Sequence, residues 1–183
     1  MSKIINIPEQ EFFNNKTGEF YYTKSATIKI EHSLVSIAKW ESKWHVAFLD
    51  DKVKKTNEMM IDYIRCMTIS QNVDPDVYYY LTAENFKEIN DYIDDPMTAT
   101  IFTDINKNKG GRGEFVTNEL VYYWMTVNNI PWECEKWHFN RLMTLIRICS
   151  EKNAPAKKMS RRDVLNHNRA LNEARKRASG TRG

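Results

Sequence analysis

Cys134 and His138 stand four residues apart in PWECEKWHFNRLMTLIRICS (131–150), a stretch that we predict to be helical. Residues four apart share one face of a helix, so a thiolate and an imidazole there could bind a metal ion or form a nucleophilic Cys–His pair. A structural zinc ion needs four ligands, and the sequence has no second pair with metal-type spacing. We therefore predict that both side chains belong to the core, and we predict no metal ligand, no cofactor and no catalytic residue.

A glycine-rich stretch at 106–113, NKNKGGRG, could in principle cradle a phosphate group. It lacks the GxxxxGK[ST] spacing of a phosphate-binding loop, and no apolar strand precedes it, so we predict a connecting loop instead. The sequence also has no GxSxG and no HExxH. The paired carboxylates at 50–51 and 94–95 fall at predicted turns or helix ends, where solvation accounts for them. We expect a protein that is not an enzyme.

The most strongly charged part of the chain is its C-terminal segment, KKMSRRDVLNHNRALNEARKRASGTRG (157–183). Residues 150–183 include 10 basic and 3 acidic residues, which leaves 17 basic and 21 acidic residues for 1–149. Ser160 and Asp163 have the spacing of a capping box, so we predict a helix from Arg161 to about Ala178. Its apolar stripe consists of Val164, Leu171, Ala174 and Ala178.

Basic side chains of this helix are the candidate partner-binding residues: Arg161, Arg162, Arg169, Arg175, Lys176 and Arg177. They could contact the phosphates of a nucleic acid, dock on a protein, or form a solvated tail. The rest of the chain is mildly acidic and shows no helix-turn-helix, RRM or zinc-finger pattern. A capped helix with an alanine-rich stripe suits a protein groove, and we favour a protein partner over a nucleic acid.

The segments that must position these residues are predicted to be mostly helical, because apolar residues recur every three or four positions after a capping residue. Four such stretches are 33–48, 56–70, 82–95 and 117–129, with the predicted caps Ser33, Thr56, Thr82 and Thr117. The apolar stripes of the first three are Ile37, Trp40, Trp44 and Phe48; Met60, Tyr63 and Met67; and Phe86, Ile89 and Ile93. The fourth stretch is apolar nearly all round, so we expect it at the centre of the protein. A turn at Asp74-Pro75 leads into a short helix. A helix that restarts at Pro131 and buries Trp137, Leu142, Leu145, Ile146 and Cys149 completes an αα-hairpin.

Residues 10–30 predict a β-hairpin with its turn at 14–18, in which Ile28 and Ile30 point to one face. The expected fold class is therefore mainly α (α+β). We expect a helical domain over 1–153 that includes this small N-terminal hairpin, followed by a basic linker and C-terminal helix over 154–183. Hydrophobic residues make up 42% of the chain and aromatic residues 12%, which is enough for a core.

The three cysteines, Cys66, Cys134 and Cys149, form no CxxC pair and are odd in number, which predicts free thiols in a reducing compartment. No secretory signal is evident at the N-terminus, and no apolar run approaches the roughly 20 residues that a membrane-spanning helix needs. We expect a soluble protein inside the cell, with no membrane partner.

Several stretches together resemble one family. They are HSLVSIAKWESKW (32–44), DYIRCMTISQNVDPDVY (62–78), DDPMTATIF (94–102), ELVYYWMTVNNIPWECEKWHFNRLMTLIRICSEKN (119–153) and the closing segment 157–183. They resemble proteins from the tail-morphogenesis region of long-tailed bacteriophages, the tail assembly chaperones. The resemblance covers most of the chain, and its motifs are packing and surface motifs.

This resemblance implies a non-enzymatic protein that binds the aggregation-prone tape-measure protein and helps tail-tube subunits to polymerise around it. It also implies work in the host cytoplasm during assembly, with a homo-oligomer as a further possibility. A helical body with apolar, methionine-rich grooves would suit such a task, because these can hold the amphipathic helices of a client.

Two alternatives remain open at this point. The chain could be a structural virion component, such as a head–tail connector or tail-completion protein, and would then be found in the virion. It could also be a DNA-binding accessory protein that uses the basic tail.

Overall fold

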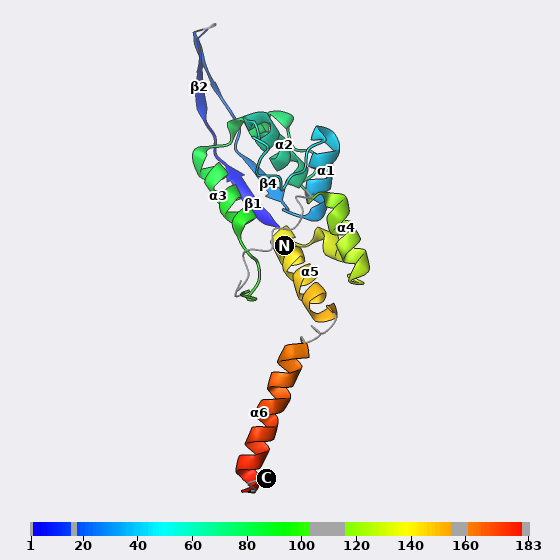
Figure 1. Ribbon diagram of the computed structural model, residues 1–183. Coiled ribbons are helices and arrows are strands. Elements are labelled where there is room, and N and C mark those ends of the chain that lie inside the picture. The colour runs from blue at the N-terminus through cyan, green and yellow to red at the C-terminus, as the bar shows by residue number, and fades with distance from the viewer. Residues whose placement is uncertain (1, 16–17, 103–115, 155–160, 181–183) are drawn as a thin grey trace. The chain divides into compact units, whose positions relative to one another are not determined.

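The computed structural model describes residues 2–15, 18–102, 116–154 and 161–180 (Figure 1). Its elements in chain order are β1 (Lys3–Ile7), β2 (Glu11–Asn14), β3 (Glu19–Tyr22), β4 (Ala26–Ile30), α1 (Leu34–Trp44), α2 (Asn57–Met67), the 3₁₀ helix η1 (Pro75–Tyr80), α3 (Ala83–Asp94), α4 (Asn118–Val127), the 3₁₀ helix η2 (Trp132–Lys136), α5 (Phe139–Asn153) and α6 (Arg161–Ser179). The chain forms two units, Met1–Glu151 and Lys152–Gly183. The fold is mainly α with some β, which confirms the predicted class.

The hairpin predicted for 10–30 is confirmed as β2 and β3, whereas β4 pairs with β1, so that the strands form one long antiparallel ribbon. β1 pairs with β4 and β2 with β3, and both pairs keep the same register, with Ile7 opposite Ala26 and Glu11 opposite Tyr22. Pro8 lies between β1 and β2, where it cannot donate to the ladder. The ribbon therefore bends there, and β2 and β3 extend away from the helices (Figure 1). The sequence prediction missed β1, in which Ile5 lies opposite Ile28 and Ile7 shares the same buried face.

One face of the β1–β4 pair is the floor of the core. Ile5 and Ile7 from β1 and Ile28 and Ile30 from β4 are almost fully buried, which confirms the predicted orientation of the β4 isoleucines. The chain after α2 also lies along the outer edge of β4, where Ile69 N–H donates to the carbonyl oxygen of Lys29 at 2.8 Å. This contact satisfies part of an edge that would otherwise be open.

The predicted helices α1, α2 and α3 are confirmed with their N-caps, Ser33, Thr56 and Thr82. The predicted buried face of α2 is wrong in one residue. Met59 is buried and Met60 is 42% exposed, because the indole Nε1 of Trp40 donates to the carbonyl oxygen of Met59 at 2.9 Å and fixes how α2 faces α1. Two adjacent methionines cannot both face the core of one helix, and the periodicity alone does not choose between them.

The first helix ends earlier than predicted. α1 stops at Trp44, and His45 takes a left-handed conformation at the C-cap (φ 54°). Phe48, predicted as the last residue of the apolar stripe, therefore lies in the following loop. It still packs in the core, with its ring centroid 5.3 Å from that of Trp40 and 4.2 Å from that of Tyr63.

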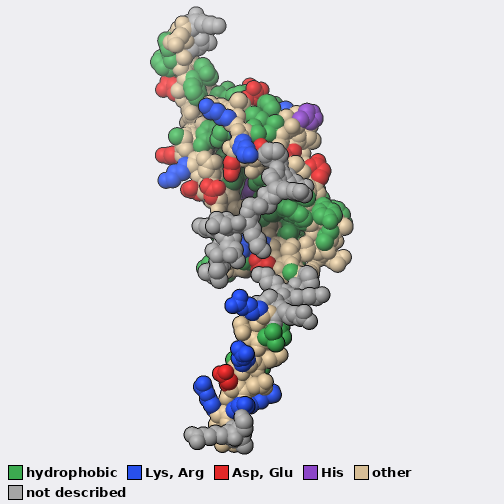
Figure 2. All heavy atoms as spheres, in the orientation of Figure 1, with side chains coloured by type: hydrophobic (Ala, Val, Ile, Leu, Met, Phe, Trp, Pro, Cys, Tyr) green, Lys and Arg blue, Asp and Glu red, His purple; other side chains and the backbone are tan. Residues whose placement is uncertain are grey.

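α4 is not the central helix that its composition predicts. Only one side is buried, through Val121 and Met125, while Tyr123 is 60% and Val127 57% exposed. Figure 2 shows hydrophobic side chains gathered over this helix. Thr117 occupies the N-cap position but makes no side-chain cap bond there.

A buried glutamate replaces the missing cap of α4. The carboxylate of Glu41 on α1 accepts hydrogen bonds from the backbone N–H of Asn118 at 2.8 Å and from its side-chain amide at 2.6 Å. Its other oxygen accepts from the backbone N–H of Phe48 at 2.7 Å. A negative charge at the first turn of α4 also suits the helix dipole. Glu41 thus joins α1, the loop after it and α4.

The helix predicted to run from Pro131 to Cys149 is two helices. Pro131 is the N-cap of η2, and a new helix, α5, begins at Phe139. The backbone N–H of Phe139 donates to the carbonyl oxygen of His32 at 2.9 Å, which ties this break to the β4–α1 junction. Leu142 and Ile146 are buried as predicted, but Trp137, Leu145 and Cys149 are only half-buried.

The C-terminal helix is confirmed, since α6 spans Arg161–Ser179 against a prediction of Arg161 to about Ala178. Ser160, the predicted cap, lies outside the described residues, as does the glycine-rich stretch 106–113.

Removing residues 157–183 is expected to change the melting temperature of the protein by less than about 2 °C, because the first unit ends at Glu151 and contains all the core residues found in the described part of the chain. Differential scanning calorimetry of the truncated and full-length chains measures this. As a control, truncation before α5 removes Leu142 and Ile146 and should abolish cooperative unfolding. A drop of many degrees on the shorter deletion would show that α6 contributes to the stability of the first unit.

Candidate protein-binding site

The predicted partner-binding residues are on the surface of α6. Arg162, Arg169, Arg175, Lys176 and Arg177 are all exposed, and Figure 2 shows basic side chains along this helix. Arg161 is its first residue, and its side chain is outside the described part of the structure. Positions seven apart on a helix share a face, so the helix brings Arg162, Arg169 and Lys176 together.

The apolar stripe of α6 is exposed too. Val164 is 41% and Leu171 42% exposed. Leu165, which was not predicted as part of the stripe, is 67% exposed and falls on the basic side by helical periodicity. An amphipathic helix that presents both faces to solvent is typical of a segment that packs on a partner.

A second candidate is an apolar cleft between α2 and α3 that the sequence did not reveal. It has a volume of about 190 Å³ and is lined chiefly by Trp40, Phe48, Met59, Met60, Phe86 and Ile93. A neighbouring hollow of about 390 Å³ shares Met60, Phe86 and Asn90 with it. The two hollows together form a groove between the helices. Phe86 and Ile93 were predicted to be buried, and they are instead partly exposed on its wall.

The cleft carries one charged side chain among the described residues that line it, Lys55. Its Nζ atom lies 5.3 Å from the ring centroid of Phe48, within the range of a cation–π contact. Tyr63 at the floor is buried, and burial raises the pKa of its hydroxyl far above the ordinary value of 10.0, so it stays neutral. The cleft is therefore an apolar surface with a single positive charge.

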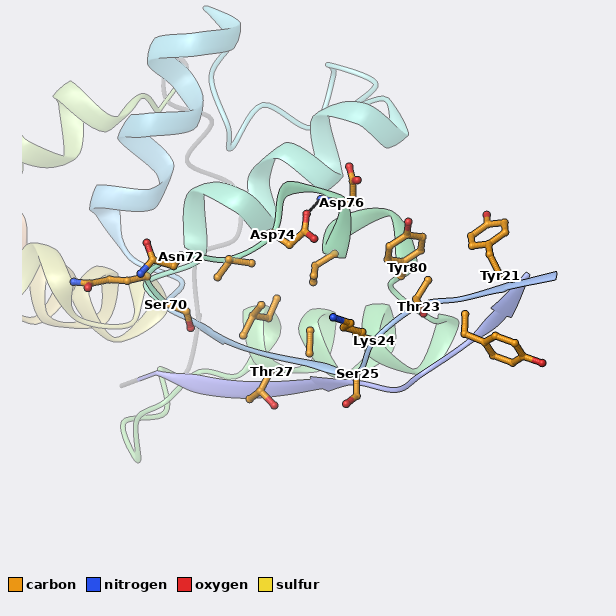
Figure 3. Close-up of a pocket in the computed structure, with 16 residues that line it drawn as sticks. Tyr21, Thr23, Lys24, Ser25, Thr27, Ser70, Asn72, Asp74, Asp76 and Tyr80 are labelled. Atoms are coloured by element: carbon orange, nitrogen blue, oxygen red, sulfur yellow. Dashed lines mark hydrogen bonds between the residues drawn. The ribbon is translucent and has the colours of Figure 1, made fainter. Parts of the chain in front are cut away.

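A third hollow is polar and has a volume of about 490 Å³. It lies between the β3–β4 side of the ribbon and the segment from Ser70 to Tyr80 (Figure 3). Lys24, Asp74 and Asp76 are its charged residues. The Asp74 carboxylate accepts from the backbone N–H of Asp76 at 3.0 Å and caps η1, so it already has a structural role. We find no arrangement for acid–base chemistry in it.

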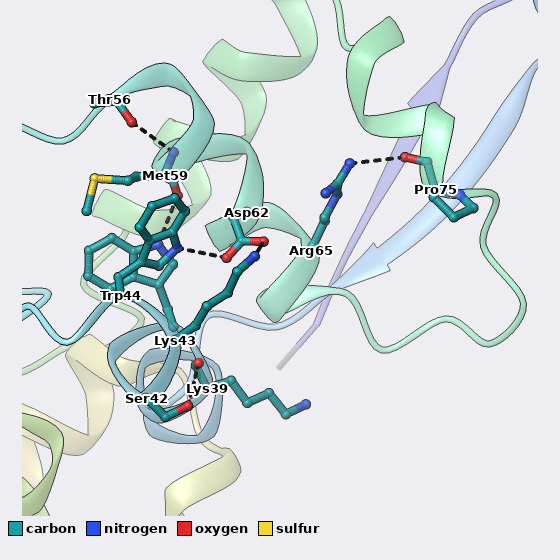
Figure 4. Close-up of polar contacts among 10 residues, drawn as sticks. Lys39, Ser42, Lys43, Trp44, Thr56, Met59, Asp62, Arg65 and Pro75 are labelled. Carbon is teal, nitrogen blue, oxygen red and sulfur yellow. Dashed lines mark hydrogen bonds and ion pairs between the residues drawn. The ribbon is translucent and has the colours of Figure 1, made fainter.

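Asp62 is a buried carboxylate whose oxygens are both occupied (Figure 4). Oδ1 lies 2.5 Å from the Nζ atom of Lys43, and Oδ2 accepts from the indole Nε1 of Trp44 at 2.8 Å. A charge this deeply buried requires such partners. The group holds the end of α1 against α2, and its geometry indicates a structural role.

His138, one of the two residues considered for metal or nucleophilic chemistry, is part of a buried polar cluster with His32, Tyr63 and Tyr92. Its Nε2–H donates to the carbonyl oxygen of Tyr92 at 2.9 Å, and its ring centroid is 5.0 Å from that of His32. Nδ1 of His32 lies 2.5 Å from the Tyr63 hydroxyl, while the backbone N–H of His32 donates to the Tyr92 hydroxyl at 3.2 Å. These contacts join the β4–α1 junction, α2, α3 and α5.

Cys134 is not placed with His138 on one helix, because Cys134 belongs to η2 and His138 precedes α5. Burial raises the pKa of the Cys134 thiol, and burial lowers the pKa of His138. The shifts favour a neutral thiol at Cys134 and a neutral imidazole at His138, whereas an activated pair needs a thiolate. Within the described ranges, no three His, Cys, Asp or Glu side chains lie together as metal ligands would.

No helix in the described part of the chain is both long and apolar enough to span a bilayer. A comparison of this chain with models of protein families, with curated proteins and with solved structures finds no match. The candidate site therefore rests on the geometry of α6 and of the cleft between α2 and α3.

Proposed function

We propose that this protein is a non-enzymatic tail assembly chaperone of a long-tailed bacteriophage, which binds the tape-measure protein and meets tail-tube subunits in the host cytoplasm. The resemblance of its packing and surface motifs to that family suggests the biological setting. The observation that carries the binding function is α6, a helix with exposed arginines and lysines and an exposed apolar stripe.

The physical reason is that a long helical client exposes amphipathic surfaces before it is assembled. An exposed helix with an apolar stripe can cover such a surface, and its cations can select a client with acidic side chains. The methionine side chains around the cleft between α2 and α3 would add an adaptable apolar surface.

Charge reversal on α6 tests the proposal. We expect Arg162→Glu, Arg169→Glu and Lys176→Glu together to weaken binding to the tape-measure protein about tenfold or more, because three aligned cations become anions. The measurement is the amount of soluble tape-measure protein that co-purifies after co-expression. A matched control reverses three exposed lysines of the first unit, Lys29, Lys39 and Lys52, and should leave co-purification unchanged.

Three other outcomes would contradict the proposal. Failure of the wild-type chain to co-purify with the tape-measure protein, or to keep it soluble, would argue against a chaperone. Stoichiometric copies in purified virions, detected by mass spectrometry, would favour the structural virion component. Binding to DNA that falls steeply with added salt and is lost in the α6 variant would favour the DNA-binding accessory protein.

A further inference from the structure

We propose that the cleft between α2 and α3 is a second binding site, which takes the apolar face of an acidic amphipathic helix from the client. One large apolar side chain of that helix enters the pocket over Trp40 and Phe48, and a nearby carboxylate pairs with Lys55. That the occupant is a protein client rests on the proposed function. The chemistry of the occupant rests on the cleft itself.

The dimensions of the cleft suit a helix with spaced apolar anchors. Its pocket of about 190 Å³ is somewhat larger than a cavity that holds benzene, so it has room for one large apolar side chain. The adjoining hollow continues past Met60 and Phe86 along both helices. Anchors at positions i, i+3 and i+7 of a bound helix would lie along such a groove. Buried anchors of this kind dominate the energy of many interfaces.

The charge expected of the bound client helix follows from the position of Lys55. It is the charged residue that lines the pocket, and its Nζ atom lies over Phe48 at the pocket wall. A carboxylate beside the apolar anchor would pair with this ammonium group, whereas a lysine or arginine there would be repelled at short range. Charge complementarity thus favours an acidic helix.

The chain's own exposed helix, α6, carries the wrong charge to pair with Lys55 in this cleft. α6 spans Arg161–Ser179 and contains six basic residues against Asp163 and Glu173. The same acidic client would satisfy both α6 and Lys55. One client chemistry therefore accounts for two separate surfaces, which is our reason for preferring it to a second copy of the chain.

Synthetic peptides added to the full-length protein test the proposal. The first is an alanine-based helical peptide of about 18 residues with phenylalanine and leucine anchors at i, i+3 and i+7 and glutamates beside them. The second replaces each glutamate with lysine, and the third replaces the anchors with alanine. By fluorescence anisotropy, we expect a Kd below about 100 µM for the first peptide, and weaker binding for the other two by about tenfold or more.

Variants then locate the site. Lys55→Glu should weaken binding of the acidic peptide about tenfold and strengthen binding of the lysine peptide. This is a reversal of preference between the two peptides rather than a general loss of binding. Met60→Glu places a charge at the mouth of the cleft and should abolish binding of the acidic peptide, while the exposure of Met60 makes the change tolerable for folding. Lys52→Glu is the matched control, because this exposed lysine of the same loop is not among the residues lining the cleft.

Three results would overturn the proposal. The first is equal binding of the acidic and lysine peptides, with no change in Lys55→Glu. The second is tighter binding of a peptide of residues 161–179, which would make the cleft a site for the chain's own helix. The third is binding of decanoate with no binding of any peptide, which would make it a small-molecule pocket.

The proposal and the proposed function can fail separately. If the tape-measure protein co-purifies with Met60→Glu and Lys55→Glu as well as with wild type, the chaperone function stands and the cleft is not its site. If the wild type binds the acidic peptide and Lys55→Glu prefers the lysine peptide, but no tape-measure protein co-purifies, the cleft is a binding site and the chaperone function is wrong.

Discussion

Replacing Glu41 by alanine is expected to lower the free energy of unfolding by about 3 kcal/mol, because three hydrogen bonds to a buried carboxylate are lost and their donors stay behind. Hydrogen bonds to charged groups contribute about 1.5–3 kcal/mol each, and water entering the space left by the side chain offsets part of the loss. The backbone N–H of Asn118 would also lose the acceptor that caps α4. Urea unfolding followed by circular dichroism measures the change.

Glu41→Gln is expected to lower the free energy of unfolding by about half as much as Glu41→Ala, since the amide keeps one acceptor oxygen but turns an NH₂ group toward a donor. The matched control is Glu151→Ala, which removes an exposed glutamate of α5 that pairs with Arg147 one turn away at 2.9 Å. That change should cost no more than about 0.5 kcal/mol. If Glu41→Ala and Glu151→Ala destabilise the protein equally, Glu41 is not the cap of α4.

The role of Glu41 illustrates what the sequence could predict about the fold. Local signals were sufficient where a cap and its helix are neighbours, as at Ser33, Thr56 and Thr82. The cap of α4 comes from 77 residues earlier in the chain, and no local pattern contains that information. The same holds for the break before α5, which depends on a hydrogen bond to His32.

Patterning also failed where apolar residues surround a helix. α4 and the start of α2 carry more apolar side chains than one buried face can accommodate. The sequence therefore predicted a central helix at 117–129 and a buried Met60, whereas the structure exposes Tyr123 and Met60. The same excess could have marked Met60 as a side chain available to a partner, although it does not reveal the cleft around it. A helix that is apolar on two faces must either be central or leave one face for a partner.

The basic helix was easier to predict, because the sequence signals for it, a capping-box spacing and a charge pattern, are local. The binding role proposed for it depends on a partner, which the chain's own sequence does not describe. The cleft between α2 and α3 could not be predicted at all, since its walls come from segments about 30 residues apart whose approach is set by the core beneath them.

Acid is expected to destabilise the protein more steeply than its surface charges alone would. Burial, and then the neighbouring imidazole of His138, lower the pKa of His32 from 6.5 to about 3, so the folded chain keeps His32 neutral at a pH where the unfolded chain protonates it. The unfolded state therefore binds more protons between pH 6.5 and about 3. The stability that neutral His32 permits is fully present above pH 6.5 and is lost progressively as the pH falls through that window.

The expected loss from His32 is about 1.4 kcal/mol per pH unit within the window, or about 3 kcal/mol by pH 4. Burial lowers the pKa of His138 as well, which adds a loss of the same sign. Urea unfolding at a series of pH values gives the slope for the wild type and for His32→Gln, whose amide can still reach the Tyr63 hydroxyl. The variant should start less stable but lose less stability on acidification, because it has one buried titrating group fewer.

Comparing the slopes separates His32 from the carboxylates, which titrate in both proteins. His167→Gln, a change at an exposed histidine of α6, is the control and should keep the wild-type slope. Should His32→Gln be too unstable to unfold cooperatively, the NMR signal of His32 in the wild type is a direct measurement, and it should not shift between pH 7.5 and 5. A His32 signal that titrates near 6.5, or identical slopes in all three proteins, would mean that the cluster joining α2, α3 and α5 tolerates a charge, and that its histidines do not set the acid limit of the fold.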